Sequence, residues 1–363
     1  MKYPVSAPKA QSPRKIIFGV LGVVSIVLTT VLSGPVAGAQ APPVDATTQW
    51  VTRPPLGLAR AGHGVATARG VVYAVGGRSV EGLKFDSVET RKLGGPGNWT
   101  TIAPLPVGRG NLSVAEAGGL VYAIGGVYGE NDFSGGSTTE VDRYQPATGK
   151  WEAMAPLPQP RDTAGAASLN GTLYVAGGFI EDAPFTWHVT DSVLAYDAAA
   201  NAWRSVAPMP EPREGFRLVA AGKYLYAVGG GGDASFASLA TAERYEPATD
   251  TWTVMAPMNE SRWLPCAVKV TVGGQELIAV VGGAVWAEDG SFVQGRATTE
   301  VLDPKTGEWS VIDALLPFMR GSIDCAVKDS ATVLAIGGGT AVNGEFVYIS
   351  DVDELTLKRR DVD

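Results

Sequence analysis

The sequence predicts an all-β fold in which one four-stranded unit recurs six times and closes into a ring. Apolar runs ending in a Gly-Gly doublet recur six times along the 363 residues, at spacings of 49 to 55 residues. The order of short segments within each unit is also fixed. Composition agrees, because 46 Gly, 24 Pro and only 18% charged residues indicate many turns and few exposed helices. A period near 50 residues is typical of β-propellers.

Each unit divides into four pieces that read as antiparallel strands. In the second unit these are residues 111–118, 120–126, 138–149 and 150–158, rich in Val, Tyr and Trp and bounded by Gly, Pro or Asn. A four-stranded sheet cannot bury its own faces, so stacking around a ring supplies the core. The doublets that end the second strands let the next blade approach closely, and they are Gly76 and Gly77, Gly125 and Gly126, Gly177 and Gly178, Gly229 and Gly230, Gly282 and Gly283, and Gly337 and Gly338.

A Trp opens the fourth strand of five units, at Trp99, Trp151, Trp203, Trp252 and Trp309. A Tyr stands in the third strand at Tyr144, Tyr196 and Tyr245, whereas the first and fifth units carry Arg91 and Leu302 there. This combination of doublet, Tyr and Trp resembles the kelch repeat over residues 48–363. The resemblance implies a kelch-type β-propeller, and we interpret the Trp series as filler between blades whose indole N–H finds a carbonyl.

Counting the repeats predicts how the ring closes. Six doublets are followed by only five Trp strands, and the sixth unit ends without a Trp. Near the N-terminus, residues 47–52 repeat the pattern of the missing fourth strand, with Trp50 at the position of the Trp. We therefore expect a six-bladed propeller in which the strand around Trp50 completes the last blade and removes its open edge.

The first 39 residues read as a signal peptide. No acidic residue occurs in them, an uncharged run covers residues 16–32, and small residues at Ala37 and Ala39 suit a signal peptidase. We expect residues 40–47 to be a linker and residues 48–363 the propeller. The alternative is an uncleaved membrane anchor at 16–32, which is short for a span of about 17 to 25 residues. Both interpretations place the body outside the cytoplasm, so the protein is expected to be secreted or otherwise extracytoplasmic.

Loss of the leader makes the protein more acidic. It removes four positive charges and takes the net charge from −8 to −12. A field of that sign repels phosphate backbones and anionic membranes, so nucleic acid is not an expected partner, and membrane contact is expected only through a retained leader. We expect a monomer.

An Arg recurs in the loop before each inner strand, at Arg60, Arg109, Arg161, Arg213, Arg262 and Arg320. We interpret it as a brace between blades that donates to backbone carbonyls, and the alternative is contact with a ligand. The residues just after it vary, and variation on a repeated frame is where function is usually placed. We expect these to project towards the central channel, and they are Ala61, His63, Gly110, Asn111, Asp162, Thr163, Glu214, Phe216, Trp263, Gly321 and Ser322.

Asp162 and Glu214 occupy equivalent positions on neighbouring blades. Paired carboxylates can bind a cation, hold a sugar hydroxyl or carry out acid and base chemistry. The alternative is two solvated loop carboxylates. Aromatic side chains beside carboxylates suit a carbohydrate or a peptide, and the ligand-binding candidates are Arg78, Tyr128, Asp162, Glu214, Arg217, Trp263 and Trp286.

The residues predict no catalytic set, metal or cofactor. The two histidines, His63 and His188, cannot alone make a three-ligand zinc site, and there is no phosphate loop or nucleophile elbow. We expect an exported binding or scaffold module whose loop face at the channel takes an unknown protein or carbohydrate.

Two enzymatic alternatives come from resemblance. The first is a sugar isomerase similar to the sialic acid mutarotases, with Asp162 or Glu214 as base and Arg217 or Arg78 holding a substrate carboxylate. That family implies a Glu and an Arg just after one doublet, and no doublet here has such a pair. The more remote alternative is a copper-radical oxidase, which needs a Tyr-Cys pair and two gathered histidines.

The two cysteines, Cys266 and Cys325, both begin the phrase Cys-Ala-Val-Lys in inner strands of adjacent blades. Export favours oxidation and the even count permits one disulfide. Equivalent positions on neighbouring inner strands are expected to exceed the Cα separation of about 7 Å that a bridge tolerates. We therefore predict a free, buried pair.

Overall fold

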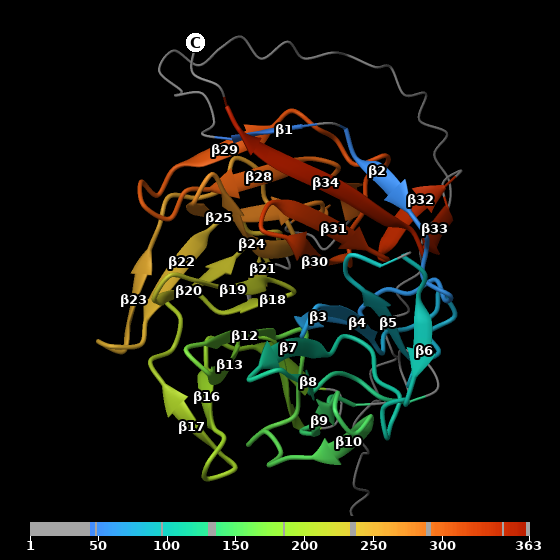
Figure 1. The fold of residues 1–363 in the computed structure, drawn as a ribbon. Helices are drawn as coiled ribbons and strands as arrows, with labels where there is room; N and C mark the ends of the chain where they lie inside the picture. The colour runs from blue at the N-terminus through green and yellow to red at the C-terminus, as the bar shows by residue number, and fades with distance from the viewer. Residues whose placement is uncertain are drawn as a thin grey trace, which may run out of the picture. The chain divides into compact units, whose positions relative to one another are not determined.

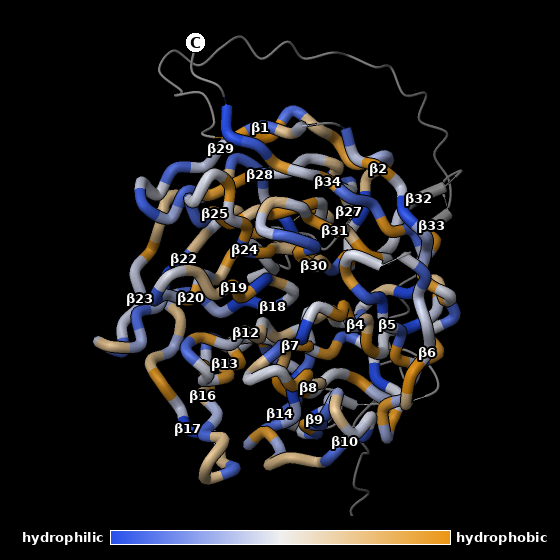
Figure 2. The backbone as a smooth tube through the Cα atoms, viewed as in Figure 1, coloured by the Kyte–Doolittle hydropathy of each residue, from blue (hydrophilic) through white to orange (hydrophobic). Residues whose placement is uncertain are grey.

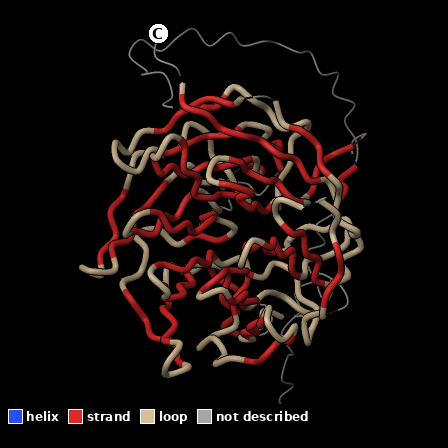
Figure 3. The backbone as a smooth tube through the Cα atoms, in the orientation of Figure 1, coloured by secondary structure: helices blue, strands red, loops and turns tan. Residues whose placement is uncertain are grey.

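The computed structural model describes residues 44–47, 49–95, 97–129, 136–183, 186–232, 237–287, 292–342 and 345–360. The chain divides into two units, residues 1–40 and 41–363, and every described residue belongs to the second. The predicted leader therefore lies outside the described residues. Strands and loops make up the described part, with no helix (Figure 3). Within that part, no helix is long and apolar enough to cross a membrane.

Four-stranded antiparallel sheets dominate the fold (Figure 1). From the inner to the outer strand, blade 1 contains β3 (Gly64–Ala68), β4 (Val71–Val75), β5 (Val88–Lys92) and β6 (Thr100–Ile102). Blade 2 contains β7 (Ser113–Ala117), β8 (Leu120–Ile124), β9 (Val141–Gln145) and β10 (Lys150–Ala153). Blade 3 contains β12 (Gly165–Leu169), β13 (Thr172–Ala176), β16 (Val193–Asp197) and β17 (Ala202–Val206).

The second half of the chain repeats this plan. Blade 4 contains β19 (Arg217–Ala221), β20 (Tyr224–Val228), β22 (Ala242–Glu246) and β23 (Thr251–Val254). Blade 5 contains β24 (Cys266–Val272), β25 (Gln275–Val281), β28 (Thr299–Leu302) and β29 (Trp309–Ile312). Blade 6 contains β30 (Asp324–Asp329), β31 (Thr332–Ile336) and β34 (Val352–Arg359), with β1 (Val44–Ala46) and β2 (Val51–Arg53) at its outer edge.

The six inner strands form a closed ring. Each contacts the inner strands of its two neighbours, and β30 contacts β3 to complete the circle. Hydrophobic and hydrophilic stretches are interspersed along the strands (Figure 2). The buried apolar residues form clusters between adjacent blades. The fold is thus the all-β propeller that the repeat predicts.

Additional short strands lie in the loops at one end of the blades, where the Gly-Gly doublets are. They are β11 (Arg161–Asp162) with β14 (Phe179–Ala183) and β15 (Thr186–Val189), β18 (Arg213–Glu214) with β21 (Gly231–Gly232), β26 (Ala284–Trp286) with β27 (Phe292–Gly295), and β32 (Gly339–Val342) with β33 (Glu345–Tyr348). In blades 3 and 4 they pair the loop after the doublet with the loop before the inner strand.

The glycine doublets join each blade to the next. The second Gly of every doublet donates its N–H to the carbonyl of the repeated Arg in the following blade, at 2.8 to 2.9 Å. The first Gly must remain small, because a Cβ on Gly125 would lie 2.2 Å from the Arg161 carbonyl oxygen, and its φ is +56°. The bond from Gly338 to Arg60 closes the circle.

The repeated arginines donate to backbone carbonyls as predicted, but the prediction that they brace one blade against the next was wrong, because their side chains bond within their own blade. All six are buried. Each donates to a backbone carbonyl just before the third strand of its own blade. Five also pair with a carboxylate in that strand, namely Glu89, Asp142, Glu243, Glu300 or Asp353. In blade 3 the equivalent residue is Leu194, and Arg161 bonds the Ser192 hydroxyl instead.

The Trp series links the outer strands. Every indole N–H in the series donates to a backbone carbonyl at the end of the preceding blade, at 2.9 to 3.3 Å. Trp50 takes part through Ala314, and it is buried, being only 7% exposed. The predicted closing strand differs in detail: two short strands, β1 and β2, flank Trp50, and both pair with β34. The prediction of a linker over residues 40–47 was wrong for residues 44–46, because β1 pairs with β34 and so belongs to the last blade.

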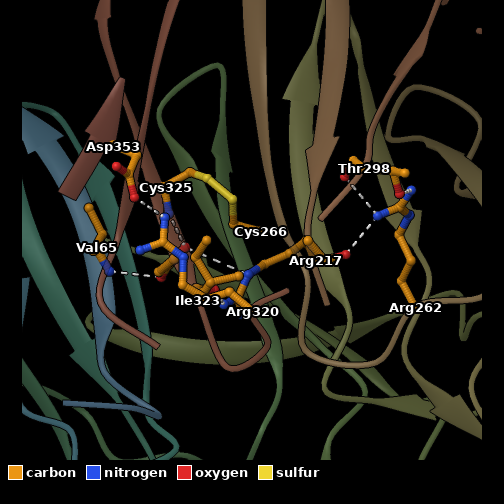
Figure 4. Close-up of a disulfide and its surroundings, with 11 residues drawn as sticks. Val65, Arg217, Arg262, Cys266, Thr298, Arg320, Ile323, Cys325 and Asp353 are labelled. Atoms are coloured by element: carbon orange, nitrogen blue, oxygen red, sulfur yellow. Dashed lines mark hydrogen bonds and ion pairs between the residues drawn. A yellow bond between two sulfur atoms is a disulfide. The ribbon is translucent and has the colours of Figure 1, made fainter. Parts of the chain in front are cut away.

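The cysteine prediction was wrong. Cys266 and Cys325 form a disulfide with a Cα separation of 5.5 Å, which is within the bridging range. Cys266 pairs with the residue before its doublet, whereas the ring-equivalent position in blade 6 is Asp324. Cys325 is therefore one residue further along its strand, and at the narrow centre of the ring this offset brings the two sulfurs together (Figure 4).

Candidate functional site

A collar of left-handed residues surrounds the mouth of the channel on the loop side. Its six members have φ between +47° and +59°, and they are Gly62, Asn111, Thr163, Gly215, Leu264 and Ser322. Backbone N–H groups of Asn111, Thr163, Gly215 and Leu264 each donate to the collar residue of the preceding blade, at 2.6 to 2.9 Å. The collar is thus a rigid backbone platform, and the residue before each member lies on its loop side.

The residues just before the collar carry large side chains on only three neighbouring blades. Asp162, Glu214 and Trp263 occupy this position in blades 3, 4 and 5, whereas the other three blades have Ala or Gly. Each pairs with the residue that follows the doublet of its own blade. We call Asp162, Glu214 and Trp263 the mouth cluster. The structure brings these three predicted candidates together.

The carboxyl group of Glu214 is shielded from solvent. It is 2% exposed, and its Oε1 accepts a bond from the Trp263 indole N–H. A Cβ on Gly231 would lie 2.6 Å from Oε1, so glycine makes room for the acid. Its Oε2 is buried and has no hydrogen bond among the described residues. Burial raises the pKa of Glu214 to about 8, and Asp162 adds to this rise, whereas the Trp263 bond and the nearby Thr163 hydroxyl oppose it.

Asp162 is also buried, but a side-chain hydroxyl group donates a hydrogen bond to its carboxylate. The Ser137 hydroxyl donates to its Oδ2 at 2.5 Å. Burial raises the pKa of Asp162 to about 6, although the Ser137 and Thr163 hydroxyls oppose the rise. Glu181 adds to it and Arg78 lowers it. At neutral pH Asp162 is therefore mostly ionised while Glu214 holds a proton. The interpretation of these two acids as solvated loop carboxylates does not fit their burial.

The raised pKa of Glu214 predicts a pH-dependent stability. The ordinary glutamate value is 4.5, and the folded value is about 8. Burial disfavours the ionised carboxylate only in the folded state. The free energy of unfolding therefore falls as pH rises from the unfolded-state pKa towards the folded-state pKa. We expect the melting temperature of the wild type, relative to Glu214→Gln, to fall from pH 4.5 to pH 8. A difference that does not vary with pH would contradict the assignment.

The remaining candidates lie around the mouth cluster to different degrees. Trp286 packs edge-on against Trp263, with ring centroids 5.5 Å apart. Arg78 lies over the Tyr348 ring and is near enough to Asp162 to lower its pKa. Tyr128 is exposed on the blade 2 loop, where its backbone N–H donates to the Gly136 carbonyl, so this bond ties it to its own loop and not to the cluster.

Arg217 lies deeper, inside the channel. It is the first residue of β19, and its Nη2 donates to the Ile323 carbonyl at 2.8 Å while its Nε lies 3.6 Å from Asp324 Oδ1 (Figure 4). Both partners belong to blade 6, so the side chain crosses towards the far part of the ring. Arg217 lines a channel cavity of about 260 Å³ that the mouth cluster does not line. The structure thus separates Arg217 from Glu214.

Two expected channel-facing residues are core residues. Phe216 is fully buried between blades 3 and 4, where Gly165 and Gly177 make space for its ring. His63 is buried near Gly337, and burial together with Arg60 lowers its pKa to about 3, so it is neutral. Both predictions of projection into the channel were wrong, because the alternation of the strand turns these side chains between blades.

Sequence reasoning missed several partners of the candidates. The Ser137 hydroxyl donates to Asp162 and lowers its pKa, and Asp324 pairs with Arg217. The signal for Asp324 was available, since it stands at the same register in blade 6 as Arg217 does in blade 4. No group of three or more potential metal ligands occurs within the described ranges.

The doublets, buried arginines and Trp bonds together define a kelch-type β-propeller. The chain belongs to the kelch-repeat family, since the model of the KLHDC2/KLHL20/DRC7 Kelch-repeats domain matches residues 111–339. It is similar to Kelch-like protein 35 of Mus musculus, with 29% identity over 54% of this chain and 31% of that protein. Beta-scruin of Limulus polyphemus is 27% identical over 58% of this chain and 23% of that protein.

Among solved structures, that of YjhT has the same fold. It aligns with a TM-score of 0.68 at 17% identity, over 83% of this chain and 95% of that one. The similarity to the curated relatives spans about a third or less of their length.

Proposed function

We propose that this propeller is a binding module that takes a protein segment or a glycan over the mouth cluster. The observation that supports it most is the Glu214 carboxyl group, which is buried beside an indole and has an oxygen without a hydrogen bond among the described residues. A protonated Oε2 offers a donor, the ionised Asp162 an acceptor, and Trp263 with Trp286 an apolar surface. Peptides and sugars are recognised by this combination of polar and aromatic groups.

We also propose that the protein acts outside the cytoplasm. The charged and apolar pattern of residues 1–39 supports export. The Cys266–Cys325 disulfide supports it independently, because structural disulfides are rare in reducing compartments.

The binding proposal is tested by probing the mature protein against a glycan array and a peptide library. We expect Glu214→Ala and Trp263→Phe each to weaken the binding of any hit at least tenfold, because each removes one side of the indole-carboxyl contact. Trp187→Phe, at an exposed aromatic on the blade 3 loop, serves as the control and should bind as the wild type does. Hits that all survive both mouth substitutions would refute the mouth cluster as the site.

A sugar isomerase is the second candidate, and one observation favours it. The pKa values of Asp162 and Glu214, raised to about 6 and about 8, lie on either side of neutral pH, as an acid and base pair requires. The separation of Arg217 from the cluster leaves Arg78 as the cation for a substrate carboxylate. Faster anomer exchange of a sugar acid with the wild type, abolished in Glu214→Gln, would establish catalysis and overturn the preference for a binding module.

A further inference from the structure

A second cavity lies on the face opposite the mouth, at the seam between blades 6 and 1. It has a volume of about 220 Å³. Inner strands begin at the collar, so the far end of β30, the end of β5 and the turn after it lie on this face. Four cations line the cavity, namely Arg53, Arg91, Lys92 and Lys328. Its other described lining residues are Pro54, Leu93 and three glycines, so no acid lines it.

Arg91 is the unusual member of this group. It stands where three other blades have a Tyr, and it is 7% exposed. Its side chain donates no hydrogen bond among the described residues, and its Nη1 is buried. Burial lowers the pKa of Arg91, Glu354 opposes this effect and Arg53 adds to it. A buried guanidinium nitrogen without an acceptor is costly, and an anion in the cavity would supply an acceptor for this side chain.

The charges around Arg91 are only partly compensated. Glu354 pairs with Arg53 at 3.0 Å and with Lys328 at 2.9 Å. Lys92 is exposed and makes no ion pair within the described part of the chain. Four cations and one carboxylate leave three positive charges around the cavity, on a protein whose net charge is −8. Such a local excess favours a doubly charged tetrahedral oxyanion over a single carboxylate.

We propose that the basic pocket formed by Arg53, Arg91, Lys92 and Lys328 is a binding site for a sulfate or phosphate group. Arg91 offers the planar guanidinium and Lys92 an unpaired ammonium. Gly97 lies against Arg91, where a Cβ would come within 3.2 Å of Nη2, so the absence of a side chain leaves the guanidinium room. This site is separate from the mouth cluster and does not depend on the function proposed for it.

The test is isothermal titration calorimetry of the full chain at constant ionic strength. The probes are inorganic sulfate, inorganic phosphate and acetate, followed by glucose 6-sulfate and glucose 6-phosphate to separate free anions from esters. We expect one site per chain, with sulfate or phosphate binding at least tenfold more tightly than acetate. Arg91→Tyr restores the residue of the other blades and should abolish this binding. Lys92→Gln should weaken it several-fold, and Lys150→Gln, on exposed β10, should leave it unchanged.

Near-ultraviolet circular dichroism checks that Arg91→Tyr is folded, and Lys92→Gln decides the matter if it is not. The proposal is overturned if the wild type shows no binding beyond that of chloride. Unchanged affinity in a folded Arg91→Tyr, or in Lys92→Gln, overturns it as well.

Discussion

Deletion of residues 44–53 is expected to lower the melting temperature of the propeller sharply. The deletion removes β1 and β2, which together cover the outer edge of β34. It also takes Val44 and Trp50 from the core between blades 5 and 6. The last blade would then be left with an exposed edge, and the indole bond that ties it to Ala314 would be lost.

A single substitution measures the main part of this effect. Trp50→Ala removes a buried indole and should cost about 3 to 5 kcal/mol of unfolding free energy, as large-to-small core changes of Trp do. Val51→Ala is the matched control, because its side chain is 41% exposed in the adjoining strand and its loss should be nearly neutral. Chemical denaturation of the three proteins gives the comparison. Equal stability of Trp50→Ala and the wild type would contradict closure through Trp50.

Replacing both cysteines by alanine is expected to destabilise the protein by about 2 to 4 kcal/mol, the usual contribution of a native disulfide. The bridge joins β24 to β30 across 59 residues and restricts the unfolded chain. It also holds the two inner strands together beside Arg217 (Figure 4), and Arg217 pairs with Asp324.

Thiol labelling of the denatured, unreduced wild type provides the check. No thiol should react, and prior reduction should lower the stability of the wild type to that of the double variant. Two reactive thiols without reduction would contradict the bridge.

The sequence repeat predicted almost all of the fold. The doublets allow close approach of the backbones of adjacent blades, and each Trp donates an indole hydrogen bond to the preceding blade. Because each feature has one physical role in every blade, their spacing alone predicts the blades. Counting doublets and Trp strands also predicted how the ring closes. It did not predict that the closing strand is divided in two around Trp50. That division depends on how β34 extends past the indole, which no repeat encodes.

The candidate site was predicted only in part. Asp162, Glu214 and Trp263 share one position in the repeat, which is why sequence reasoning found them. Their burial depends on the collar and on Ser137, which lies in a loop that the repeat does not specify. The disulfide was missed because a one-residue offset of Cys325 and the convergence of inner strands are properties of the assembled ring.

The proposed function depends on a buried Glu214 carboxyl group that is protonated at neutral pH. Carbon-13 NMR of the glutamate side-chain carboxyls, recorded over a range of pH, measures this protonation, with Glu214→Gln to assign the resonance. The structure predicts that Glu214 titrates at about pH 8. Titration near the ordinary value of 4.5 would mean an ionised, solvated carboxylate at neutral pH, and would contradict the shielding of Glu214 from solvent in the mouth cluster.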